Sequence, residues 1–102
     1  MPDRVLKQLK AAASVHRLQL LHWLKDPVAH FPPQRDGDLV LDGVCSVFIA
    51  RKWKVTAATA SRHLKVMTDA RLLLPRRKKG WTFYRRNEAE LAALKRWMSD
   101  DL

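Results

Sequence analysis

The segment from Thr56 to Met67 constrains this chain most, because its spacing predicts a capped helix with two different faces. Threonine favours the N-cap of a helix, where its side-chain oxygen accepts an early N–H. Small and apolar residues then recur at the spacing of a buried stripe: Ala60, Leu64 and Met67. The opposite face collects side chains that suit contact with phosphates and base edges: Ala58, Ser61, Arg62 and Lys65. An ordinary solvated surface helix is the alternative interpretation of the same face.

Positive charge is concentrated around this segment. The chain has 20 Lys and Arg residues against 10 Asp and Glu, a net charge of +10. Between Val44 and Arg86 a single acid, Asp69, opposes twelve bases: Arg51, Lys52, Lys54, Arg62, Lys65, Arg71, Arg76, Arg77, Lys78, Lys79, Arg85 and Arg86. Because these bases alternate with apolar positions, they indicate a folded polyanion-binding region rather than a disordered basic tail.

The length of 102 residues allows one small domain, predicted to span residues 1–102. The hydrophobic fraction of 47% is too high for intrinsic disorder, and no apolar run reaches the ~20 residues of a membrane span. Lys7 and Lys10 interrupt any leader-like segment, so we expect a cytoplasmic protein without a membrane partner. The single cysteine, Cys45, has no intrachain disulfide partner, which fits a reducing compartment.

Both ends of the chain have helical periodicity. Residues 3–25 predict two helices, and the second is capped by Ser14. Its apolar stripe consists of Val15, Leu18, Leu21 and Leu24. Asn87 and Glu90 form a capping-box pattern for a last helix over residues 88–99. Residues 28–43 have turn and proline patterns, so we expect a long irregular loop, in which Leu39 to Leu41 form either a brief strand or a gap filler.

Residues 44–70 predict a helix-turn-helix, since a helix from Val44 to Trp53 is followed after a short turn by the helix described first. Residues 72–86 predict a β-hairpin, or wing, whose first strand is limited to a sheet edge by Pro75 and whose turn is the basic segment 77–80. The fold class is therefore mainly α with a small β-hairpin (α+β), in a winged helix-turn-helix arrangement.

This order of elements resembles that of the ArsR-type winged helix-turn-helix regulators over most of the chain. Three segments carry the resemblance: Ser14 to Leu21, the recognition-helix segment Thr56 to Met67, and the wing strand Trp81 to Tyr84. The resemblance implies a transcriptional repressor that binds an inverted-repeat operator in double-stranded DNA as a homodimer joined through its terminal helices. The apolar stripes of both terminal helices are consistent with a dimer.

The sequence also departs from the family pattern. Many relatives sense metals through a Cys-Val-Cys segment, whereas this chain keeps only Cys45, with Val47 at the second thiolate position. Since a soft-metal site needs three or four ligands, we predict no metal and no other cofactor, and Cys45 is a weak metal or thiol sensing candidate whose alternative role is a buried apolar residue. Arg71 replaces an expected glycine after the recognition helix, where a left-handed backbone would cost on the order of 1 kcal/mol.

These observations predict a sequence-specific DNA-binding transcriptional regulator. The expected DNA-binding residues lie on the helix and the wing: Thr56, Ala57, Ala58, Thr59, Ser61, Arg62, Lys65, Arg76, Arg77, Lys78 and Lys79. Lys52 and Lys54 are expected to attract phosphates. The alternatives are a sequence-indifferent RNA or nucleoid-binding protein and a protein-interaction module on the same scaffold. No catalytic constellation is present, so an enzyme is not expected. The loop over residues 28–43, which has His30 and Phe31 near its start and ends two residues before Cys45, is either a signal-responsive element or a plain connector.

Overall fold

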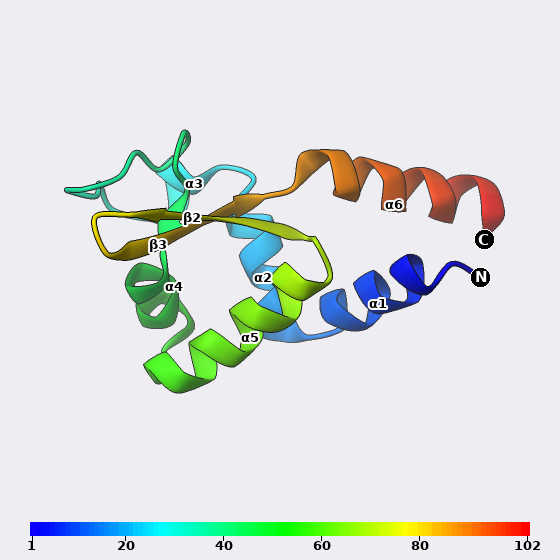
Figure 1. The fold of residues 1–102 in the computed structure, drawn as a ribbon, viewed down its shortest axis with the longest axis horizontal. Coiled ribbons are helices and arrows are strands. Elements are labelled where there is room, and N and C mark those ends of the chain that lie inside the picture. Colours follow the sequence, from blue (N-terminus) through cyan, green and yellow to red (C-terminus); the bar gives the residue numbers. More distant parts are fainter.

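The computed structural model describes all 102 residues and contains six helices and one three-stranded antiparallel sheet (Figure 1). The elements in chain order are α1 (Asp3–Ala12), α2 (Val15–Trp23), α3 (Pro27–His30), β1 (Val44–Cys45), α4 (Ser46–Trp53), α5 (Ala57–Asp69), β2 (Leu73–Lys78), β3 (Trp81–Arg86) and α6 (Glu88–Asp101). This is the expected winged helix-turn-helix, mainly helical with a small sheet. No helix is long and apolar enough to cross a membrane.

The core lies where α2, α4 and α5 meet the base of the hairpin. Its members come from all parts of the chain between α1 and α6, among them Leu20, Ile49, Leu64, Met67 and Leu72, each at most 1% exposed. The predicted stripe of α5 is confirmed, since Ala60, Leu64 and Met67 are its buried residues. Burial of each large side chain contributes roughly 1.5–3 kcal/mol, so this stripe fixes which face of α5 remains outside.

The turn between α4 and α5 uses backbone conformations that the sequence supplies locally. Lys54 adopts the left-handed conformation (φ 59°, ψ 44°) and ends α4. Thr56 then caps α5, because its side-chain oxygen accepts the N–H of Thr59 at 3.2 Å. The cap predicted from the sequence is therefore formed, and the two helices are joined by a turn of three residues.

The sheet has the strand order β1-β3-β2, and β2 is an edge strand, as Pro75 predicts. β2 continues to Lys78, which pairs with Trp81, so the predicted four-residue turn is wrong and only Lys79 and Gly80 connect the strands. Both have positive φ, 51° and 80°, the combination that a two-residue type I′ hairpin turn requires. The tip is therefore tighter than expected, and Arg77 and Lys78 belong to the strand.

Two other local predictions are wrong, and the structure removes one of the two alternatives that the sequence left open for Leu39 to Leu41. Val44 and Cys45 form β1 beside β3 instead of starting a helix. The segment Leu39 to Leu41 is a turn and not a strand, because the Asp38 carboxylate accepts the N–H groups of Val40 and Leu41, both at 2.8 Å. The loop also begins with the short helix α3.

The predicted stripe of α2 is only half right. Leu21 and Leu24 are buried together with Leu20, but Val15 and Leu18 are 72% and 59% exposed. The predicted positions repeat strictly every three residues, and each such step turns about 60° back around a helix of about 100° per residue. After three steps the stripe has moved to the opposite face, so its first and last members do not share one side.

The termini lie together at the end of the molecule away from the wing (Figure 1). Asn87 caps α6 by accepting the N–H of Glu90 at 3.3 Å, but the second half of the predicted capping box is absent, because the Glu90 carboxylate accepts from Gln8 of α1 at 3.2 Å. Apolar side chains on this end remain exposed: Leu6, Met98 and Leu102. The two terminal helices thus form an arm with uncovered apolar surface.

Candidate nucleic-acid interface

The outer face of α5 is open to solvent along its whole N-terminal half. Its predicted DNA-binding residues are exposed, apart from the half-buried Thr59: Thr56, Ala57, Ala58, Thr59, Ser61, Arg62 and Lys65. The first turn of α5 also presents N–H groups at the positive end of the helix dipole. The structure therefore brings all seven helical candidates together on one exposed surface.

A chain of hydrogen bonds orders the start of this surface. The hydroxyl of Thr56 contacts that of Thr59 at 3.1 Å, and Arg62 Nη2 donates to Thr59 Oγ1 at 3.2 Å. One edge of the Arg62 guanidinium is held against the helix in this way, while its other donors remain free. The arrangement favours an arginine that is oriented before it meets a ligand.

Unlike Arg62, Lys65 forms an ion pair within the helix. Its Nζ lies 3.0 Å from Asp69 Oδ2, one helical turn on. Both side chains are largely exposed, so this ion pair is weak and a phosphate can replace the carboxylate at small cost. Lys65 therefore remains a competent phosphate ligand at the edge of the surface.

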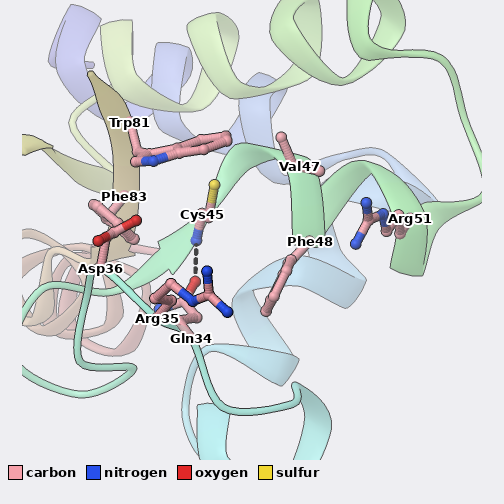
Figure 2. A pocket seen from close by; sticks show the side chains of 9 residues that line it. All are labelled: Gln34, Arg35, Asp36, Cys45, Val47, Phe48, Arg51, Trp81 and Phe83. Carbon is pink, nitrogen blue, oxygen red and sulfur yellow. Dashed lines mark hydrogen bonds between the residues drawn. The ribbon is translucent and has the colours of Figure 1, made fainter. Parts of the chain in front are cut away.

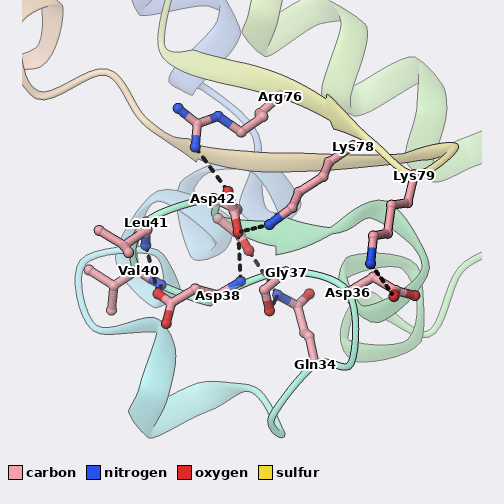
Figure 3. A network of polar contacts seen from close by, with 11 residues as sticks. Gln34, Asp36, Gly37, Asp38, Val40, Leu41, Asp42, Arg76, Lys78 and Lys79 are labelled. Carbon is pink, nitrogen blue, oxygen red and sulfur yellow. Dashed lines mark hydrogen bonds and ion pairs between the residues drawn. The ribbon is translucent and has the colours of Figure 1, made fainter.

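The basic residues of β2 are divided between the two faces of the hairpin. Arg76 and Lys78 point toward the loop before β1, where both contact the carboxylate of Asp42, at 2.9 and 3.2 Å (Figure 3). The side chain of Asp42 is only 7% exposed and also accepts the N–H of Asp38 at 2.8 Å. Chiefly this backbone hydrogen bond, and then Arg76, lower the pKa of Asp42 to about 2.

Arg77 lies on the opposite face of β2 and makes no ion pair, whereas Lys79 at the tip has a long contact of 3.9 Å with Asp36. The tip and the N-terminus of α5 lie at the same end of the molecule (Figure 1). The four predicted wing residues are therefore not equivalent. Arg77 and Lys79 are available to an external partner, while Arg76 and Lys78 hold the wing to the loop.

Two other basic residues have roles within the fold. Lys52 was expected to attract phosphates, and Arg86 is one of the twelve bases of the basic region. The Lys52 ammonium lies over the rings of Trp23 and Phe31, 5.2 and 5.9 Å from their centres. Arg86 donates to the Leu21 carbonyl at 2.9 Å and pairs with Glu88. Lys54 is exposed, as the prediction requires.

The inner side of α5 carries a histidine cluster that sequence reasoning missed. His63 stacks on His16 of α2 with 5.3 Å between ring centres, and Arg17 Nη1 lies 3.0 Å from His63 Nδ1. Because a guanidinium only donates, Nδ1 accepts and the His63 ring is neutral. Burial and then the charge of Arg17 lower the pKa of His63. Only the tertiary contact of α2 with α5 brings these residues together, and their separation in sequence gives no sign of it.

The fold and this surface agree with known proteins. The chain is 34% identical over 97 residues to YbzH of Bacillus subtilis, an uncharacterised HTH-type transcriptional regulator, and the match covers 95% of this chain and 97% of that protein. It is 26% identical, with a TM-score of 0.64, to a Mycobacterium bovis structure described as a homodimeric winged helix-turn-helix DNA-binding domain and a possible ArsR-family regulator, covering 97% and 81% of the two chains. The chain belongs to the ArsR-type transcriptional regulators.

A further crystal structure described as an ArsR family transcriptional regulator has a TM-score of 0.73 at 11% identity, covering 98% of this chain and 88% of that one, which supports the fold alone. No family model matches the chain. The resemblance predicted from the three sequence segments is nevertheless confirmed.

This ArsR-type regulator keeps its departures from the family pattern in three dimensions. Cys45 is 7% exposed, and its N–H donates to the Gln34 side chain at 2.7 Å. No three His, Cys, Asp or Glu side chains converge on one point. The backbone of Arg71 is left-handed, with a φ of 62°, so the condition for the strain considered at that position is met. Its exposed side chain lies at the junction between α5 and the wing.

Proposed function

We propose that the protein is a dimeric repressor that binds an inverted repeat in double-stranded DNA, in the cytoplasm and without catalytic activity. The observation that supports this most directly is the exposed face of α5, where Ser61 and an oriented Arg62 stand on a helix fixed by its buried stripe. A helix of this kind fits the major groove, in which base edges are distinguishable.

The roles of the individual residues follow from their chemistry. Ser61 and Arg62 contact base edges, and the methyl groups of Ala57 and Ala58 pack on thymine methyl groups. Three polar residues at the rim of the helix contact phosphates: Thr56, Thr59 and Lys65. On the wing, Arg77 and Lys79 contact the backbone beside the recognition helix, and Arg76 and Lys78 contribute mainly through their field, because Asp42 binds both.

The dimer forms through the arm made by α1 and α6. Leu6 and Met98 are 43% and 41% exposed on these helices, and Leu102 is 81% exposed at the end of the chain. Contact with a second copy would remove this apolar surface from water. A twofold axis at this end would place one recognition helix on each side, and repression would follow from the bound dimer blocking polymerase.

Selection of bound duplexes from a random library tests the proposal. We expect recovery of an inverted repeat whose half-sites lie about one helical turn, or a multiple of it, apart. A half-site recovered singly would contradict the dimer. Recovery without a consensus would favour sequence-indifferent binding, which the excess of positive charge alone could support. Failure to bind any duplex at low salt would favour the protein-interaction module.

A further inference from the structure

A cavity of about 190 Å³ lies between the loop before β1, the start of α4 and the wing strand β3 (Figure 2). The loop contributes Arg35, α4 contributes Phe48 and Arg51, and the sheet contributes Cys45 and Trp81. It is distinct from the proposed DNA-contacting face of α5, none of whose residues lines it. It also lies far from the terminal arm, since the wing and the termini are at opposite ends of the molecule.

The walls of the cavity are aromatic. Trp81 crosses one side of it above Cys45, and Phe48 stands on the other side (Figure 2). Trp81 is 45% exposed and Val47 37%, so apolar surface at this site is left uncovered by the fold itself. An apolar cavity of roughly 150 Å³ accommodates benzene. The volume here therefore fits one six-membered ring with a small substituent.

The polar groups at the rim favour an anion. Arg35 makes no ion pair or side-chain hydrogen bond, and Arg51 has only its own neighbour Phe48, with 5.8 Å from Cζ to the ring centre. The one acid of the lining, Asp36, already faces Lys79 at 3.9 Å. Two unpaired guanidinium groups beside an aromatic slot match a carboxylate attached to a ring, since arginine binds carboxylates through paired N–H donors.

We propose that this cavity binds a single-ring aromatic carboxylate, with the ring between Trp81 and Phe48 and the carboxylate at Arg35 and Arg51. The occupant would change the position of the wing tip, because two residues of the lining contact that tip. Trp81 directly follows the Lys79-Gly80 turn and pairs with Lys78, and Asp36 contacts Lys79. An effect of the occupant on DNA affinity rests on the proposed DNA-binding function, whereas binding of the carboxylate does not.

Titration of the free protein with benzoate, followed by NMR, tests the site without DNA. The expected Kd is on the order of 1 mM, given the few atoms of the ligand. We expect the largest shift at the Trp81 indole N–H, assigned with a Trp81→Phe variant, and small shifts at the other three tryptophans. Benzyl alcohol, which keeps the ring without the charge, should bind at least about fivefold more weakly. Equal binding of the two compounds, or shifts away from the cavity, would overturn the proposal.

Variants separate the two halves of the site. Arg35→Gln and Arg51→Gln should each weaken benzoate binding about threefold to fivefold, with benzyl alcohol unaffected. Val47→Phe should fill the cavity and remove binding of both compounds. Arg85→Gln removes the same charge from β3 outside the cavity and should bind benzoate like the natural chain. If the spectra show that each glutamine variant is folded, unchanged benzoate affinity in both would contradict an anion site.

The link to DNA is measured separately, as the affinity for the selected duplex with and without saturating benzoate. We expect at least a twofold change, absent in Val47→Phe. Benzoate binding with unchanged DNA affinity would overturn the coupling to the wing. A protein that binds benzoate but no duplex would instead contradict the proposed function, so the two failures are distinguishable.

Discussion

The cationic groups of α5 and those of the wing lie at the same end of the molecule but are held in opposite ways. On α5, Arg62 is supported by a neutral hydroxyl and keeps its full charge available. On β2, Arg76 and Lys78 share one buried carboxylate, Asp42, and part of their charge is neutralised within the fold. Two segments of similar basic composition therefore have different capacities for DNA.

The difference teaches that a basic residue near a nucleic-acid surface is not necessarily a ligand. Asp42 fastens the wing to the loop through Arg76 and Lys78, so these two charges act within the fold (Figure 3). The helix needs no such fastening, because its buried stripe already orients it. We infer that α5 supplies base specificity and that the wing supplies an aligned but partly neutralised phosphate contact.

The largest effect is expected from Arg62→Ala, which removes the proposed base contact. Affinity for the selected duplex should fall by ~1–3 kcal/mol, with a smaller loss on random duplex. Fluorescence anisotropy on both duplexes measures the difference. Lys25→Ala removes one exposed charge outside the surface and should cost far less. Equal losses on the two duplexes would assign Arg62 to the phosphates and remove the distinction between helix and wing.

Arg71 lies where the two regions join, and its backbone and its charge act in opposite directions. Arg71→Gly should stabilise the fold by about 1 kcal/mol, because glycine accepts a positive φ without strain. The same change should weaken DNA binding through loss of a phosphate contact. Arg71→Ala is the matched control, since it removes the charge but keeps the backbone cost. A lower melting temperature for Arg71→Gly together with unchanged affinity would contradict both parts.

Asp42→Asn tests the wing half of the comparison. Without the carboxylate, Arg76 and Lys78 should become free for phosphates, and the slope of log affinity against log salt should steepen by about 2 on any duplex, about 0.9 for each new contact. Stability should fall at neutral pH. In the natural chain the depressed pKa of Asp42 stabilises the fold above the ordinary value of 3.8, and this contribution is lost as the pH falls toward about 2.

Melting curves between pH 5 and pH 2 therefore measure the same residue independently of DNA. The melting temperature of Asp42→Asn should fall less between pH 5 and pH 2 than that of the natural chain. An unchanged salt slope, combined with an unchanged acid dependence, would mean that Asp42 does not hold the wing cations.

The sequence predicted the fold well where local rules and burial agree. Ala60, Leu64 and Met67 combine steps of four and three residues, so they stay on one side of the helix, and Thr56 and Asn87 form the caps expected of them. The stripe of α2 failed because Val15 and Leu18 belong to a strict three-residue repeat that drifts around the helix.

The candidate site was harder to predict, because its residues are selected by long-range contacts. The sequence placed the helix candidates correctly on the exposed face of α5. It could not show that Asp42 binds Arg76 and Lys78, since the partners are more than thirty residues apart. β1 was also missed, because its two residues become a strand only by pairing with β3.

The smallest effect is expected from the histidine cluster behind α5. His63 has a pKa below its ordinary value of 6.5 in the fold, so the unfolded chain takes up a proton first as the pH falls. Stability should therefore decline below pH 6.5, down to the lower pKa of the folded state. The urea midpoint of His63→Gln should vary less between pH 7 and pH 5 than that of the natural chain. Arg17→Gln removes a repelling charge, so its urea midpoint should also decline less over this range. If the natural chain and His63→Gln lose stability in parallel, the fold does not lower the pKa of His63, and His63 makes no pH-dependent contribution to stability.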